Sequence, residues 1–284
     1  MIDTYLSDLG HQVKILQEHL PAGFFEKCLQ FESIFHLHIP KTGGTFLNEA
    51  LNRYWHLNFM STRHGTCSSL RLFPDPTDAL WGKESLNYLD CDNYADALKI
   101  CVIRNPYDWL VSFYAHGTTA GNIYIPGALK GVGSLRKLYQ SFEEFVFAYS
   151  DDEAFWPPGF IGFKNFMPFQ IFDDDGNCQA DLCLRNEFLS LAIYSLLIGF
   201  GIDHRVAKQI FAQERIGKSE SRRGDDYRTH YTDKMVTRLE KKFERENQAL
   251  GYDFEKHVLD ESYIIELKNV KYIPITDKMW TLSA

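Results

Sequence analysis

Residues Ile34 to Phe46 read IFHLHIPKTGGTF, and the fold class can be inferred from them. The first part, Ile34 to Ile39, is a short run of residues that favour β-strands. The run ends at Pro40, and the sequence Lys-Thr-Gly-Gly-Thr of residues 41–45 then precedes a segment with apolar residues at helical spacing. The order strand, glycine loop and helix is typical of α/β proteins and predicts an anion site at the loop.

The loop predicts anion binding for three physical reasons. The adjacent glycines Gly43 and Gly44 let backbone N–H groups approach an anion closely. The N-terminus of the following helix offers unpaired donors and the positive end of its dipole. Lys41 adds a full charge, and the hydroxyl of Thr45 can reach the same ligand. The structural alternative is an ordinary strand-to-helix turn with a solvated lysine.

The loop differs from the magnesium-triphosphate loop of P-loop enzymes. In that loop the last glycine is followed by a lysine and then by a serine or threonine that binds Mg²⁺. Here Gly44 is followed by Thr45 and Phe46, and the lysine comes before the glycines. The pattern therefore favours an anionic co-substrate that is bound without metal and carries less charge than a triphosphate. A P-loop nucleotide kinase or hydrolase, and a nucleotide-binding module without catalysis, are the alternatives.

Length and composition predict one globular, cytoplasmic protein. The 284 residues are 45% hydrophobic and 24% charged, which is enough to bury a full core. The net charge of −8 argues against a general nucleic-acid binder. We expect no signal peptide and no membrane span, because no apolar stretch is long enough. The 6 cysteines show no zinc-ligand spacing, so free thiols and no metal site are expected.

A second strand-to-helix junction follows the apolar run Leu98 to Ile103. After this predicted strand come Arg104, Asn105 and Pro106, and then YDWLVSFYAH with helical spacing. Asn105 is a favourable N-cap, and Pro106 suits the first helical position. The junction therefore places the charged side chain of Arg104 directly after a strand.

The two junctions are expected to lie at one edge of the sheet. Strands joined through helices by right-handed crossovers are parallel, and ligands of open α/β sheets bind at the carboxyl ends of the strands. A third short strand is predicted at His56 to Met60, shortly before His64. We therefore expect Lys41, His64 and Arg104 to converge.

The sequences HIPKTGGTF and VIRNPYDWLVSFY resemble the two co-substrate signatures of the sulfotransferases, especially the carbohydrate or Golgi-type branch and its bacterial relatives. The resemblance implies that the first sequence binds the 5′-phosphosulfate of 3′-phosphoadenosine 5′-phosphosulfate. The second would bind the 3′-phosphate through Arg104 and Ser112. The later sequences LRNEFL, GKSESRR, YRTHYTD and ALGYDF resemble the family's C-terminal half, so the resemblance covers about residues 34–254.

The resemblance implies a metal-free transfer of a sulfuryl group to the hydroxyl of a glycan or another alcohol, with 3′-phosphoadenosine 5′-phosphate as product. Lys41 would stabilise charge on the bridging oxygen, and His64 would be the general base. His116 is the main rival base, whereas His36 and His38 lie in the first predicted strand, where we expect them to pack in the core or to support the site residues. The expected co-substrate residues are Lys41, Thr42, Gly43, Gly44, Thr45, Phe46, Arg104, Ser112, Lys218, Ser219, Arg222 and Arg223.

The expected fold is a three-layer, P-loop-like α/β domain with a mainly parallel central sheet flanked by helices. Residues 1–33 are interpreted as a helical lead-in, 34–254 as the sulfotransferase-like domain, and 255–284 as a C-terminal extension. Irregular, aromatic-rich residues 117–167 are interpreted as an acceptor-binding or lid insertion. Residues 232–250 predict an amphipathic helix ending at Gly251, with an inward row of Met235, Leu239, Phe243 and Leu250.

Overall fold

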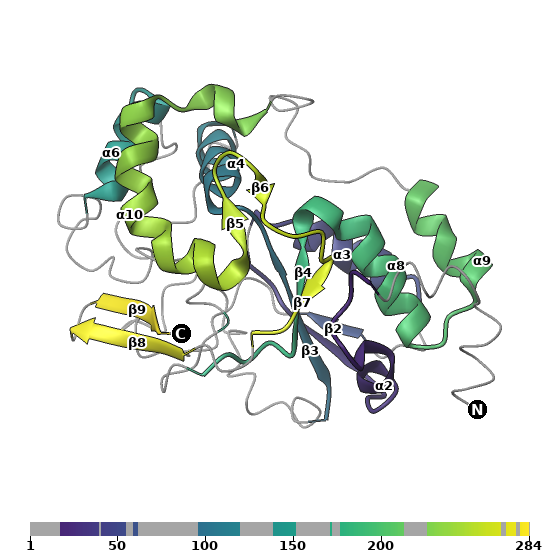
Figure 1. Cartoon of the computed structure of the whole chain (residues 1–284). Coiled ribbons are helices and arrows are strands. Elements are labelled where there is room, and N and C mark those ends of the chain that lie inside the picture. Colours follow the sequence, from purple (N-terminus) through teal and green to yellow (C-terminus); the bar gives the residue numbers. More distant parts are fainter. Residues whose placement is uncertain are drawn as a thin grey trace, which may run out of the picture.

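A five-stranded mixed sheet forms the centre of the molecule (Figure 1). The computed structural model describes residues 18–39, 41–54, 59–61, 96–119, 139–151, 171, 177–212, 226–267, 271–276 and 279–283. In spatial order the strands are β2 (Phe59–Ser61), β1 (Ile34–Leu37), β3 (Leu98–Ile103), β4 (Leu182–Arg185) and β7 (Ile264–Ile265). The first four pair in parallel, and β7 is antiparallel to β4. The prediction of an α/β fold with a mainly parallel sheet is therefore confirmed.

The central strands are apolar because both of their faces are covered. Alternate residues of β3 enter different core clusters: Ile100 and Val102 on one face, and Cys101 and Ile103 on the other. All four are fully buried. A continuous apolar run is expected for such a strand, and this explains why the predicted range Leu98 to Ile103 is also the observed one.

One group of helices packs on the face of the sheet that includes Ile100. It contains α2 (Phe24–Cys28), α3 (Gly44–Leu51) and α8 (Leu189–Gly199), followed by α9 (His204–Ala207) and the 3₁₀ turn η5 (Lys208–Ala212). Helix α8 contacts β4, α2 and α3. Nearly all of its side chains are buried, so it is apolar around its whole circumference.

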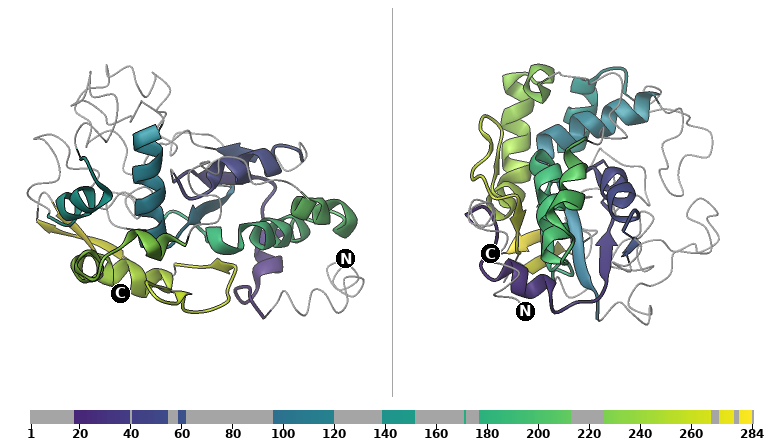
Figure 2. Two further views of the ribbon diagram at one scale, coloured as in Figure 1. Left: turned by 90° about the horizontal axis from the view of Figure 1, so that it is seen from above. Right: turned by 90° about the vertical axis from the view of Figure 1, so that its right-hand side faces the viewer.

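A second group of helices lies apart from the group around α8 (Figures 1 and 2). It contains α4 (Pro106–Thr119), α6 (Phe142–Ser150) and α10 (Asp233–Leu250), which enclose an aromatic cluster around Tyr107 and Phe145. The predicted inward row of α10 is buried, and Gly251 ends the helix with φ 65°. The predicted helix and its glycine C-cap are therefore confirmed.

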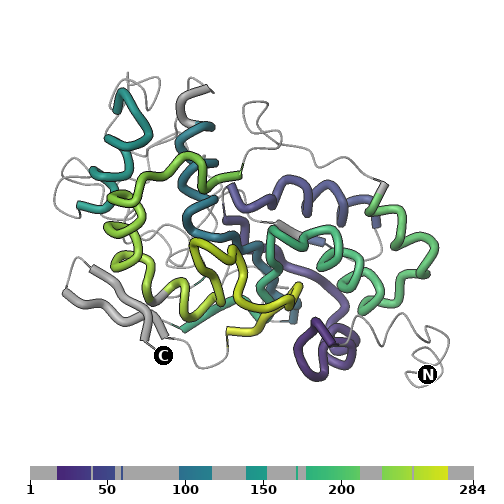
Figure 3. The backbone as a smooth tube through the Cα atoms, turned by 45° about the horizontal axis from the view of Figure 1, so that its top comes forward, coloured from purple at the N-terminus to yellow at the C-terminus, as the bar shows by residue number. Residues whose placement is uncertain are grey.

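The chain after α10 returns to the sheet edge (Figure 3). Its hairpin consists of β5 (Tyr252–Asp253) and β6 (His257–Val258). The following β7 pairs with β4, so a strand from the region expected to be an extension belongs to the sheet. A separate hairpin, β8 (Lys271–Thr276) and β9 (Met279–Ser283), follows.

Candidate anion site at the strand ends

The glycine loop after β1 is a tight turn with two residues in the left-handed region. Lys41 has φ 66° and Gly43 has φ 102°. A left-handed conformation costs a non-glycine residue about 1–2 kcal/mol. Thr42 is fully buried, and its hydroxyl donates to the carbonyl of Ile39 at 2.7 Å. The threonine side chain therefore closes the turn.

The two glycines leave space that protein side chains occupy. A Cβ atom on Gly43 would lie 2.4 Å from Nδ2 of Asn186. A Cβ atom on Gly44 would lie 2.5 Å from Cδ2 of His38 and 2.8 Å from Cε1 of His36. The sequence interpretation assigned both glycines to the approach of an anion. The structure adds a packing requirement at both positions.

Substitution of Gly44 by alanine is expected to lower the free energy of unfolding by about 3 kcal/mol, because the added methyl group overpacks two buried imidazole rings. Chemical unfolding of both proteins measures this difference. Gly201→Ala is the matched control, since no described residue other than its chain neighbours lies within 4 Å of its Cβ position and its φ of 78° is what opposes the substitution. A Gly44→Ala protein as stable as the wild type would contradict the packing described for the loop.

Helix α3 begins inside the loop and leaves its first N–H groups without a side-chain cap. Its N-cap residue is Gly43, and its first turn holds no acidic residue. Thr45 is exposed in this turn, so its hydroxyl is accessible to a ligand. Phe46 is 2% exposed and belongs to the core, which leaves its backbone N–H as its contact for a ligand.

Two buried histidines lie beneath this helix start: His36 in β1, and His38 directly after β1. The rings of His36 and His38 stack with centroids 5.1 Å apart. Nδ1 of His36 lies 2.6 Å from Oδ1 of Asn48 on α3. The packing role expected for both histidines agrees with this position.

The junction between β3 and α4 has the predicted helix start. The side chain of Asn105 accepts a hydrogen bond from the N–H of Tyr107 at 3.0 Å, and Pro106 is the first residue of α4. Nδ2 of Asn105 also donates to the carbonyls of Asp253 and His257 in the β5–β6 hairpin. One fully buried asparagine thus starts the helix and anchors the C-terminal hairpin.

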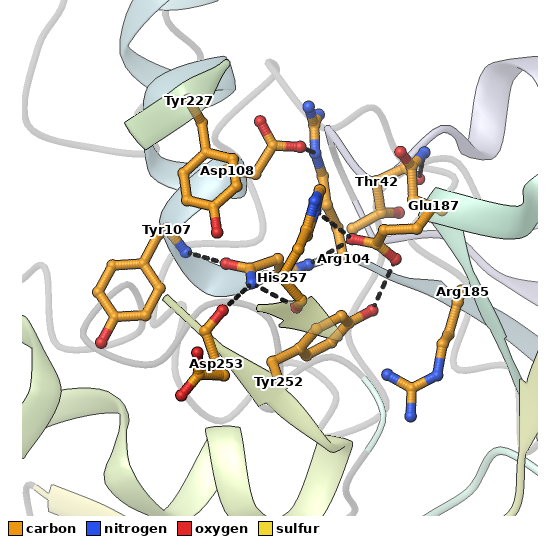
Figure 4. A network of polar contacts seen from close by, with 12 residues as sticks. Thr42, Arg104, Tyr107, Asp108, Arg185, Glu187, Tyr227, Tyr252, Asp253 and His257 are labelled. Atoms are coloured by element: carbon orange, nitrogen blue, oxygen red, sulfur yellow. Dashed lines mark hydrogen bonds and ion pairs between the residues drawn. The ribbon is translucent and has the colours of Figure 1, made fainter. Parts of the chain in front are cut away.

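Arg104 connects the two junctions directly. Its NH1 group donates to the carbonyl of Lys41 at 2.9 Å, although the residues are 63 positions apart. Its Nε pairs with Oδ2 of Asp108 at 2.5 Å (Figure 4). A guanidinium has five N–H donors, so three of them form no hydrogen bond to the residues that the structure describes. The residues around Lys41 and Arg104 therefore meet at one sheet edge, as the topology predicts.

The remaining predicted site residues divide into two groups. Ser112 lies on α4, two turns after its start, and is 9% exposed, whereas His116 is exposed in the last turn. The others fall outside the described parts of the chain: His64, Lys218, Ser219, Arg222 and Arg223.

The turn after β4 contributes two residues that the sequence interpretation did not assign to the site. They belong to the 3₁₀ turn η4 (Asn186–Phe188). Asn186 donates from Nδ2 to the carbonyl of Thr42 at 2.5 Å. Oε1 of Glu187 accepts from the N–H of Asn105 at 2.9 Å (Figure 4). Their signal in the sequence is their position directly after an apolar strand, β4, which pairs in parallel with β3.

A polar network extends from Glu187 to the C-terminal segment. Its Oε2 accepts from the hydroxyl of Tyr252 at 3.0 Å, and its Oε1 lies 3.4 Å from Nε2 of His257. Burial, together with the nearby Glu187 carboxylate, raises the pKa of Tyr252 well above its usual value. The phenol therefore remains a donor to the carboxylate at neutral pH.

Arg185 completes this network on the far side of Tyr252. It is 1% exposed and donates to the carbonyl of Gly251 at 3.3 Å and to Asp260 at 3.1 Å. Its guanidinium also lies 5.0 Å from the centre of the Tyr252 ring. The arginine thus fixes the segment after α10 against the end of β4.

The described residues were compared with the requirements of a metal site and of a membrane span, and they meet neither. They contain no group of three His, Cys, Asp or Glu side chains that could hold a metal ion. Within the same residues, no helix is both long and apolar enough to cross a membrane. Comparison with protein-family models, with curated proteins and with solved structures finds no match to this chain.

Proposed function

We propose that this protein transfers a sulfuryl group from 3′-phosphoadenosine 5′-phosphosulfate to the hydroxyl of a glycan or another alcohol, in a three-layer P-loop-like fold. The observation that supports this most is the hydrogen bond from Arg104 to the carbonyl of Lys41. It joins a lysine-glycine loop, at a helix whose N-cap residue Gly43 offers no side-chain cap, to a guanidinium that has three N–H groups without a hydrogen bond to the described residues. A nucleotide with phosphate at both ends of its ribose requires two such anion sites.

In this proposal, residues of both junctions bind the two ends of such a donor. At the 5′ end, the ammonium group of Lys41, the hydroxyl of Thr45 and the N–H groups of the first turn of α3 would bind the phosphosulfate. At the 3′ end, Arg104 and the hydroxyl of Ser112 would bind the phosphate. The segment 213–225 supplies four further residues in this proposal: Lys218, Ser219, Arg222 and Arg223.

The chemistry requires charge stabilisation and one proton transfer. The acceptor oxygen forms a bond to sulfur while the bond from sulfur to the bridging oxygen breaks, and the electron pair leaves with 3′-phosphoadenosine 5′-phosphate. Lys41 would stabilise the charge that develops on the bridging oxygen. His64 would accept the proton of the acceptor hydroxyl, since the pKa of an unperturbed imidazole lies near neutrality.

A screen with isotopically labelled donor tests this function. Neutral glycans, lipids and phenols are incubated with the protein and the donor, and mass spectrometry detects products that have gained one sulfate. We expect a sulfated product to form equally in the presence of EDTA. Turnover of ATP or GTP that requires Mg²⁺, with no transfer of sulfate, would replace the proposal by a kinase or hydrolase.

Substitution of His64 by alanine separates an enzyme from a binding module. We expect turnover to fall by about 10²–10⁴-fold while the affinity for 3′-phosphoadenosine 5′-phosphate is unchanged, because a general base acts on the acceptor and not on the nucleotide. His116→Ala is the matched control, and its turnover should stay within about twofold of wild type. Full turnover by His64→Ala would exclude His64 as the base.

A further inference from the structure

The turn after β4 reaches both anion junctions at once. The register of β3 and β4 pairs Ile103 with Arg185, so the residues that follow the two strands emerge side by side. From this position Asn186 contacts the glycine loop and Glu187 contacts the residue after Arg104.

Asn186 fits closely against the glycine loop. Its amide donates to the carbonyl of Thr42, and the same Nδ2 atom occupies the space where a side chain on Gly43 would begin. A side chain at position 43 would therefore collide with the amide of Asn186, in addition to being strained by the left-handed φ. Asn186 fixes the backbone from which the loop N–H groups point.

Glu187 is held on both of its oxygens. Oε1 accepts from the N–H of Asn105, and Oε2 accepts from Tyr252. The side chain is 7% exposed, so its charge is largely removed from water and depends on these donors. Glu187 thereby fixes the peptide unit that joins Arg104 to the start of α4.

We infer that Asn186 and Glu187 are positioning residues that hold the Lys41–Gly43 turn and the Arg104–Asn105 turn at the spacing needed by a ligand with an anionic group at each end. The inference rests on the proposed function for its choice of ligand. The fixed conformation of the two turns does not depend on the proposed function, because it follows from the contacts alone. A ligand with one anionic group uses one turn and is insensitive to their spacing.

Amide hydrogen exchange of the whole chain tests whether Asn186 and Glu187 hold the two turns in a fixed conformation. In Asn186→Ala we expect exchange in residues 41–46 to rise by about tenfold, and in Glu187→Ala the same rise in residues 104–108, because each variant loses a buried hydrogen bond. Glu187→Gln keeps an oxygen for the N–H of Asn105 and should restore slow exchange. Asn52→Ala, at an exposed position after α3, is the matched control. Unchanged exchange in both turns would overturn the inference.

Calorimetric binding then distinguishes positioning from general packing. Both alanine variants should bind 3′-phosphoadenosine 5′-phosphate about tenfold more weakly than wild type. Inorganic phosphate should bind within about twofold of wild type, because it needs only one turn and each variant leaves the other turn intact. Equal losses for both ligands would overturn the positioning role. If the wild-type protein binds no bisphosphate nucleotide, the proposed function is wrong. Hydrogen exchange would still show whether Asn186 and Glu187 hold the two turns in place.

A milder variant keeps the test decisive if Glu187→Ala does not fold. Tyr252→Phe removes only the phenol donor to Oε2 and leaves the ring against Arg185. The carboxylate is then held on one oxygen, and exchange in residues 104–108 should rise by about threefold. Exchange equal to wild type in Tyr252→Phe would overturn the role of Glu187.

Discussion

Substitution of Lys41 by methionine is expected to lower sulfuryl transfer by about 10²–10³-fold, the usual cost of removing a donor aimed at developing charge. Methionine retains the length of the side chain and the same backbone preference, so stability should change little. The measurement is the rate of sulfate transfer from labelled donor at saturating concentrations. Lys234→Met, on the exposed face of α10, is the matched control.

A second variant at this position separates charge from backbone strain. Lys41→Gly removes the ammonium group and also the steric cost of the φ of 66°. It should lose transfer as fully as Lys41→Met and yet unfold at no lower denaturant concentration than wild type. Retention of transfer by either variant would remove Lys41 from the mechanism.

Substitution of Arg104 by alanine is expected to raise the KM for the donor by about 10–100-fold. Hydrogen bonds to charged groups contribute about 1.5–3 kcal/mol, and the guanidinium also supports the carbonyl of Lys41. Arg104→Lys keeps the charge but cannot donate at fixed angles to a phosphate, Asp108 and Lys41 together. The KM of Arg104→Lys for the donor should rise by about tenfold.

Steady-state kinetics with varied donor measure this effect. Arg53→Ala, at an exposed position after α3, controls for a general loss of positive charge and should leave the KM unchanged. A KM for Arg104→Ala equal to that of wild type would show that this guanidinium serves only to hold the glycine loop.

The parallel sheet and the helix starts could be predicted from local sequence. Strand β3 is a six-residue apolar run ended by Arg-Asn-Pro, and α10 combines an apolar row with a glycine C-cap, so each boundary has its own chemical signal. The two-residue strand β7 has no such signal. Its place in the sheet depends on pairing with β4, which no local pattern specifies.

The candidate site could be predicted only as far as its two junctions. The sequence places Lys41 and Arg104 after parallel strands, but their connection through a backbone carbonyl depends on the closed turn. The pair of Arg104 with Asp108 has i,i+4 spacing and could have been anticipated. The contact of Asn186 with Thr42 could not have been anticipated, because the two residues are 144 positions apart in the sequence.

Calorimetric titration of the wild-type protein with two nucleotides tests the central claim that both junctions bind one ligand. 3′-Phosphoadenosine 5′-phosphate should bind at least about tenfold more tightly than adenosine 5′-phosphate, because only the former reaches Arg104 as well as the glycine loop. Equal affinity for the two nucleotides, or binding of neither, would contradict the account.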